Sequence, residues 1–201
     1  MGGGKYPVLK TPAAIAASDK LTLLGDMVFD GETSSELIFL SAGSIDSTDL
    51  TSISHPGTLG FGSFDTLTLE NVSLTAGELE LRSLDSVILK NSELVTHSTG
   101  ADFIHIMAAS EINAEQLSIK TREIIMSAMT INLTSVTFPG NSIVELNSAY
   151  GGMGAGGKYP NFGSSIYGRV NFVNDVKYGA SLINTTTAFD APGVNITIGK
   201  L

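Results

Sequence analysis

The sequence predicts an all-β protein, a right-handed parallel β-helix of about seven to eight coils, each with about 20–25 residues. Three observations lead to this fold. Apolar residues occupy every second position over long stretches, which is the pattern of a strand with one buried face. The alternating pattern then recurs about every 20 residues, as expected of stacked coils that cannot bury an inner face alone. Finally, a polar residue returns at one fixed position of the coil.

The repeat is clearest between residues 58 and 97, where two successive coils match position by position. Leu59 and Leu79 are 20 residues apart, as are Phe61 and Leu81. The same spacing relates Leu69 to Leu89. We therefore expect Leu81 and Leu89 to point into the coil and to be buried.

The remaining elements follow in chain order. We expect residues 1–19 to form a lead-in or cap, with a short helical turn at Ala13–Ala17, and residues 20–201 to form one β-helix domain. Strands are predicted from Leu21 onward. The excursion at 149–165 is rich in glycine and breaks the period. A last short strand is predicted at 195–198, bare and uncharged.

The fixed polar position is expected to lie at a sharp bend between strands. Asn tolerates the left-handed backbone conformation, and its amide group can bond to the backbone and to the next amide along the stack. We interpret this structural polar ladder as part of the fold and not as a catalytic site. Its members are Asp49, Asn71, Asn91, Gln116, Ser135 and Asn174.

Composition restricts the classes of partner. The net charge is −9 and charged residues make up only 15 % of the chain. An acidic chain cannot neutralise phosphate groups, which argues against nucleic acid. No apolar stretch has the length of a membrane span, so membrane insertion is not expected. The chain has no Cys, which excludes disulfides and thiolate metal sites. We expect no cofactor.

The irregular coils are followed by 137–146, by the Gly-rich stretch, and then by 168–172 and 176–179. This succession resembles the closing part of large secreted bacterial β-helix proteins of the filamentous-haemagglutinin and autotransporter type. The resemblance implies a secreted or surface-exposed scaffold with an adhesive or structural role, and it supplies no catalytic residues. The first residues carry no signal-peptide pattern. The expected location is nevertheless extracellular or at the cell surface.

Two functions remain open. The first is a non-catalytic β-solenoid with a structural or adhesive role, which recognises a surface polysaccharide or protein and associates with itself end to end or by strand exchange. The second is a β-helix that binds or cleaves polysaccharide, and the acid and base signatures expected of a cleaving enzyme are missing. The predicted recognition loop lies in the Gly-rich stretch and consists of Tyr150, Lys158, Tyr159 and Phe162.

Overall fold

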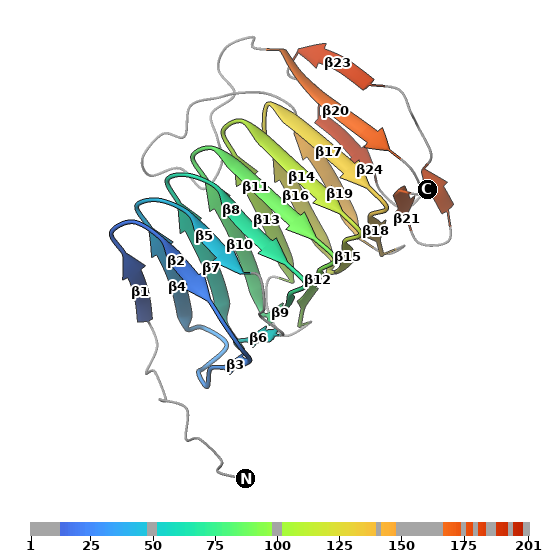
Figure 1. The fold of residues 1–201 in the computed structure, drawn as a ribbon. Helices are drawn as coiled ribbons and strands as arrows, with labels where there is room; N and C mark the ends of the chain where they lie inside the picture. The colour runs from blue at the N-terminus through green and yellow to red at the C-terminus, as the bar shows by residue number, and fades with distance from the viewer. Residues whose placement is uncertain are drawn as a thin grey trace.

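The computed structural model describes residues 13–47, 52–97, 102–139 and 142–147, and the strands at 167–173, 176–178, 181–183, 188–192 and 195–198. All of the regular structure in these residues is β-strand. The strands form three sheets that wrap around one core, and the coils advance from β1 toward β20 (Figure 1). The chain climbs along the rear sheet and descends along the front sheet as it advances, so the coil is right-handed.

Each sheet takes one strand from every coil. Sheet A consists of β1 (Ala13–Ala17), β4 (Glu36–Ser41), β7 (Thr58–Ser63), β10 (Glu78–Ser83), β13 (Phe103–Ala108), β16 (Glu123–Ser127), β19 (Ile143–Asn147) and β24 (Asn195–Ile198). Sheet B consists of β2 (Leu21–Leu23), β5 (Ile45–Ser47), β8 (Leu67–Glu70), β11 (Ser86–Lys90), β14 (Glu111–Glu115), β17 (Thr130–Thr134), β20 (Tyr167–Val173) and β23 (Ala188–Pro192). Sheet C consists of β3 (Met27–Val28), β6 (Ser52–Ser54), β9 (Ser73–Ala76), β12 (Glu93–Thr96), β15 (Ser118–Lys120), β18 (Thr137–Phe138), β21 (Val176–Tyr178) and β22 (Ser181–Ile183).

The stacked parallel coils confirm the predicted fold, although their number differs slightly. From β1 to β19 the chain makes about six turns with every pairing parallel, compared with the predicted seven to eight coils. After β21 the direction reverses. The strands β22, β23 and β24 pair antiparallel with β21, β20 and β19, so all three sheets end in a returning strand.

The first strand of the stack also differs from expectation. Ala13–Ala17 form β1, which pairs in parallel with β4, and not the expected helical turn. The coil stack therefore begins at Ala13 and not at residue 20. Alanine has a high intrinsic helix propensity, but here the neighbouring strand β4 provides a full set of backbone partners, and tertiary pairing overrides that weak local preference.

The core is a set of aliphatic columns that run along the axis of the coil. In β10 the burial alternates strictly, and Leu79 and Leu81 are fully buried. Leu81 and Leu89 are both 0 % exposed, as predicted. One column passes through all parallel strands of sheet A except β1 and consists of Leu37, Leu59, Leu79, Ile104, Ile124 and Val144. Full burial of each such side chain contributes about 1.5–3 kcal/mol.

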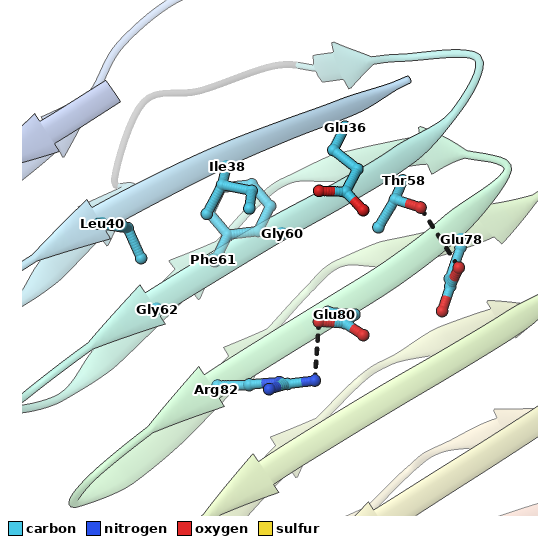
Figure 2. Close-up of a pocket in the computed structure, with 10 residues that line it drawn as sticks. All are labelled: Glu36, Ile38, Leu40, Thr58, Gly60, Phe61, Gly62, Glu78, Glu80 and Arg82. Atoms are coloured by element: carbon cyan, nitrogen blue, oxygen red, sulfur yellow. Dashed lines mark hydrogen bonds and ion pairs between the residues drawn. The ribbon is translucent and has the colours of Figure 1, made fainter. Parts of the chain in front are cut away.

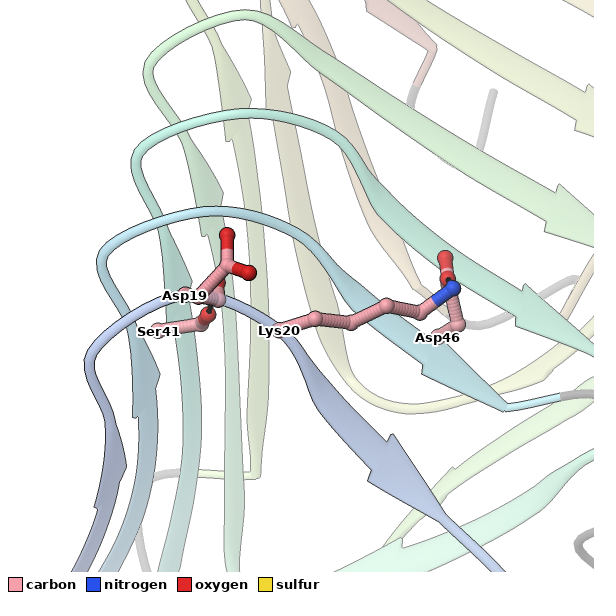
Figure 3. A network of polar contacts seen from close by, with 4 residues as sticks. All are labelled: Asp19, Lys20, Ser41 and Asp46. Carbon is pink, nitrogen blue, oxygen red and sulfur yellow. Dashed lines mark hydrogen bonds and ion pairs between the residues drawn. The ribbon is translucent and has the colours of Figure 1, made fainter.

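The corner between sheets A and B is held by buried serines. Ser41 Oγ donates to the Asp19 carbonyl oxygen of the previous coil at 2.5 Å (Figure 3). The Gly43 amide in turn donates to Ser41 Oγ. Ser83 Oγ donates in the same way to the Asp65 carbonyl. These hydroxyls form hydrogen bonds with backbone groups in the turn, where the pairing between neighbouring strands has ended.

An ion pair lies beside the same corner. Lys20 pairs with Asp46 across neighbouring coils, as Figure 3 also shows. The lysine side chain is more than half exposed, at 55 %. A pair as exposed as this contributes little to stability.

The corner between sheets B and C contains the predicted polar column. Asn71, Asn91, Gln116 and Ser135 have φ angles of 57°, 47°, 51° and 55°. The left-handed bend is therefore present at each of these described positions.

The hydrogen bonds at this bend differ from the predicted stack of amides. Backbone amides supply them: Asn71 N donates to the Lys90 carbonyl and Asn91 N to the Glu115 carbonyl, both at 3.0 Å. The side chains of Asn71 and Asn91 are exposed and not buried in the bend. Asp49 and Asn174 lie outside the described residues.

Candidate functional site

A groove crosses the outer face of sheet A where the side chains of β7 are missing. Strand β7 points Leu59 and Phe61 into the core, and on the outer face it presents Gly60 and Gly62. The neighbouring strands β4 and β10 carry full side chains in the same rows. The result is a depression of about 320 Å³, which we call the sheet A groove (Figure 2).

The two walls of the groove differ in chemistry. On β4 the wall is apolar at Ile38 and Leu40, of which Leu40 is 43 % exposed, and it ends in the carboxylate of Glu36. On β10 the wall is charged and consists of Glu78, Glu80 and Arg82. A ligand in the groove would therefore meet an aliphatic surface on one side and a row of charges on the other.

The charged wall is ordered by contacts within the groove. The Arg82 guanidinium lies 2.8 Å from a Glu80 carboxylate oxygen, and both side chains are partly exposed (Figure 2). Thr58 Oγ1 donates to Glu78 Oε2 at 3.3 Å. Glu36 stands beside Thr58 in register and completes the acidic end. The formal charge of the lining is negative, since three carboxylates face one guanidinium.

The glycines of β7 are not required by the backbone. Neither Gly60 nor Gly62 has a positive φ. A Cβ placed on Gly60 would make an ordinary contact with the Ile38 side chain at 3.6 Å. Glycine within a strand costs about 0.5–1 kcal/mol relative to alanine. Such residues often mark a place where a ligand or another backbone approaches closely.

The groove has the size of a short extended chain. Five residues of β7, Thr58–Gly62, span about 13 Å at 3.3 Å per residue. The walls on β4 and β10 are separated by two strand spacings, about 9–10 Å. Because all three strands belong to one hydrogen-bonded sheet, the shape of the groove is fixed by the coil stack.

His105 lies next to the charged wall and is buried although its row faces outward. It stands opposite Glu80 in register and is only 2 % exposed. Burial, and to a smaller extent the nearby Arg82 charge, lowers the pKa of His105 to about 4. Met107 and Ile125, which also lie in outward rows, are nearly buried as well. At these three positions the outer face of sheet A is therefore covered, whereas over β4, β7 and β10 it is open.

None of the predicted recognition residues is among the described residues that line the sheet A groove. Tyr150, Lys158, Tyr159 and Phe162 lie outside the described residues, as does the whole excursion at 149–165. The groove was not among the sites predicted from the sequence. The available signal was the pair of glycines at alternate positions of a strand pattern, which removes two side chains from one face.

Among residues 13–47, 52–97, 102–139 and 142–147 no cluster of three or more His, Cys, Asp or Glu side chains is arranged to hold a metal ion. The same part of the chain contains no helix long and apolar enough to span a bilayer.

Comparisons with known proteins returned no match, whether to a protein family, to a curated protein or to a solved structure.

Proposed function

We propose that the chain is a non-catalytic β-solenoid with a structural and adhesive role outside the cell or at its surface, and that the sheet A groove is its contact site. The observation that carries the proposal is the groove itself, a recess built on three adjacent parallel strands of sheet A, β4, β7 and β10. Rigid sites of this kind bind without first being ordered, which lowers the entropic cost of association.

The low content of charged residues and the continuous aliphatic core support a structural role as a scaffold. Catalysis would need an acid and a base left free to act on a substrate. In the groove Glu80 is paired with Arg82 and Glu78 accepts from Thr58. These contacts fit groups that hold a ligand in place.

One observation favours the second candidate, a protein that binds or cleaves polysaccharide. Glu36, Glu78 and Glu80 converge on one recess beside a cation, and paired carboxylates are what a glycoside hydrolase uses. The two functions differ in turnover. An adhesin retains its ligand unchanged, whereas a hydrolase releases reducing ends.

The test compares retention and turnover on the same protein. Beads coated with the full chain are exposed to immobilised surface polypeptides and to a panel of labelled polysaccharides, and both attachment and product release are measured. We expect attachment without product. The Gly60→Val variant fills the floor of the groove and should lose attachment, whereas Thr137→Val, at an exposed position of β18 in sheet C, should retain it. Release of oligosaccharide by the wild-type chain would overturn the proposal.

A further inference from the structure

We propose that the sheet A groove takes an extended polypeptide segment whose side chains alternate between apolar and basic. This inference rests on the proposed adhesive function and names the class of ligand. It follows from three properties of the lining: its repeat distance, its charge and the asymmetry of its walls.

The first property is the repeat distance. The walls are built from every second residue of β4 and β10, so lining side chains recur about every 6.6–6.8 Å. An extended peptide places the side chains of one face at the same interval. A segment of four or five residues laid along β7 would therefore stay in step with both walls over the length of the groove.

The second property is the charge. Glu36, Glu78 and Glu80 outnumber Arg82, so the lining attracts a cationic ligand. The same property disfavours a second copy of this chain, because its net charge of −9 would be brought against an acidic recess.

The third property is the difference between the walls. An extended segment directs alternate side chains to opposite sides. Its apolar side chains would lie against Ile38 and Leu40, and its basic side chains would reach Glu78 and Glu80. The requirement is a sequence pattern of period two, which a peptide of the same composition in blocks does not satisfy.

The lining gives less support to a sugar chain. Phe61 is the single aromatic residue of the described lining, and its ring points into the core with 2 % exposure. No aromatic face is therefore offered from the groove for a pyranose ring to stack on. Because β7 already pairs with β4 and β10, the peptide gains its contacts through side chains and not by adding a strand.

The experiment measures binding to the full chain by fluorescence anisotropy at low salt. The probes are an eight-residue peptide that alternates valine and lysine, a peptide with the same residues in two blocks, and a chitosan oligosaccharide of similar charge. We expect the alternating peptide to bind at least about fivefold more tightly than the block peptide, and to weaken as salt is added.

Variants link this binding to the groove. Glu80→Gln and Gly60→Val should each weaken the alternating peptide by about fivefold or more, whereas Glu115→Gln, which removes the same charge from an exposed position of sheet B, should not. Circular dichroism checks that every variant is folded. If Gly60→Val does not fold, Glu78→Gln serves as the second groove variant.

Three outcomes would overturn the inference: equal binding of the two peptides, binding unaffected by both Glu80→Gln and Gly60→Val, or binding of chitosan alone. The last outcome would leave the groove an adhesive site for a different ligand. Cleavage of the oligosaccharide would instead overturn the proposed function, so the two failures can be distinguished.

Discussion

Phe39 of β4 and Phe61 of β7 stack inside the coil directly beneath the sheet A groove, with ring centroids 5.2 Å apart and planes 12° apart. The two residues are in register, and Phe61 lies between Gly60 and Gly62 in sequence. The largest side chain of β7 thus points inward where the outward side chains are missing. The floor of the groove is supported from below by this ring pair.

We predict that Phe61→Ala lowers the free energy of unfolding by about 3–5 kcal/mol, because it removes a buried ring and leaves a cavity. Leu81→Ala, one coil further along the same column, should cost about 2–5 kcal/mol. Urea denaturation followed by circular dichroism measures both changes. Losses below about half a kcal/mol would mean that these side chains do not lie in a packed core.

The bend between sheets B and C gives a prediction with a matched control. Asn91→Ala should destabilise the fold by about 1–2 kcal/mol, since alanine is strained at a φ of 47°. Asn91→Gly should be neutral or slightly stabilising, because glycine adopts this conformation freely. If both variants lost equal stability, the amide group itself would be the important element, as in the ladder that the sequence suggested.

Two glycines should respond in opposite ways to alanine. Gly60→Ala is expected to raise the free energy of unfolding by about 0.5–1 kcal/mol, because the new methyl group has room beside Ile38. Gly57→Ala should lower it by about 1–3 kcal/mol, because its Cβ would overlap the Ser35 carbonyl oxygen, a backbone atom that cannot rotate away. Thermal unfolding of the two variants and of the wild type measures both changes in stability. A loss of stability in Gly60→Ala would show that the groove floor is already filled.

Because His105 is buried, we predict that the free energy of unfolding falls at acidic pH. The pKa of His105 falls from its ordinary value of 6.5 to about 4 in the folded chain, so the unfolded chain binds the proton first as pH decreases. Its contribution is fully present above about pH 6.5 and is lost between pH 6.5 and 4, an effect of about 3 kcal/mol.

The His105→Gln variant tests this assignment, because its stability should fall less steeply than that of the wild type over the same pH range. Part of the slope will remain. Burial also lowers the pKa of His55, which is fully buried at the corner beside Ser35. Parallel curves for the wild type and the variant, measured by urea denaturation at each pH, would exclude His105 as the source.

The ends of the coil stack predict self-association. Among the described strands β1 pairs with β4 alone, and its inward residue Ile15 is half-buried, whereas Phe39 at the same position of the next coil is buried. Such an edge can pair with another chain. We expect assemblies that grow with concentration in sedimentation velocity.

A charge on the edge strand should reduce this association. Ala14→Lys adds one to the exposed face of β1. Thr137→Lys, an equal charge at an exposed position of β18, serves as the control. A strict monomer at all concentrations would contradict the prediction.

The repeat in the sequence was sufficient for the fold. The alternation at Leu79–Leu81 identifies an inner and an outer face, and the 20-residue spacing to Leu59 and Phe61 places those residues in adjacent strands. These patterns are local or strictly periodic, so they survive without knowledge of the rest of the chain. The left-handed bend at Asn71 and Asn91 could also be predicted from the sequence, because it depends on residue type and on the position in the repeat.

Other features were decided by the tertiary structure. Alternating burial is the same in parallel and antiparallel strands, so the pattern at 195–198 indicated a strand but could not show that β24 runs antiparallel to β19. The Ala-rich stretch at 13–17 became a strand because β4 lay beside it.

The sheet A groove depends on three strands at once. Gly60 and Gly62 create a recess only because Ile38, Leu40 and the charged residues of β10 rise on either side of them. The alternation and the spacing of apolar residues were enough to show which residues face inward and at what interval they repeat. The stacking of β4, β7 and β10 decided what the outward residues form, because a surface is defined by neighbours that are about 20 residues apart in the chain.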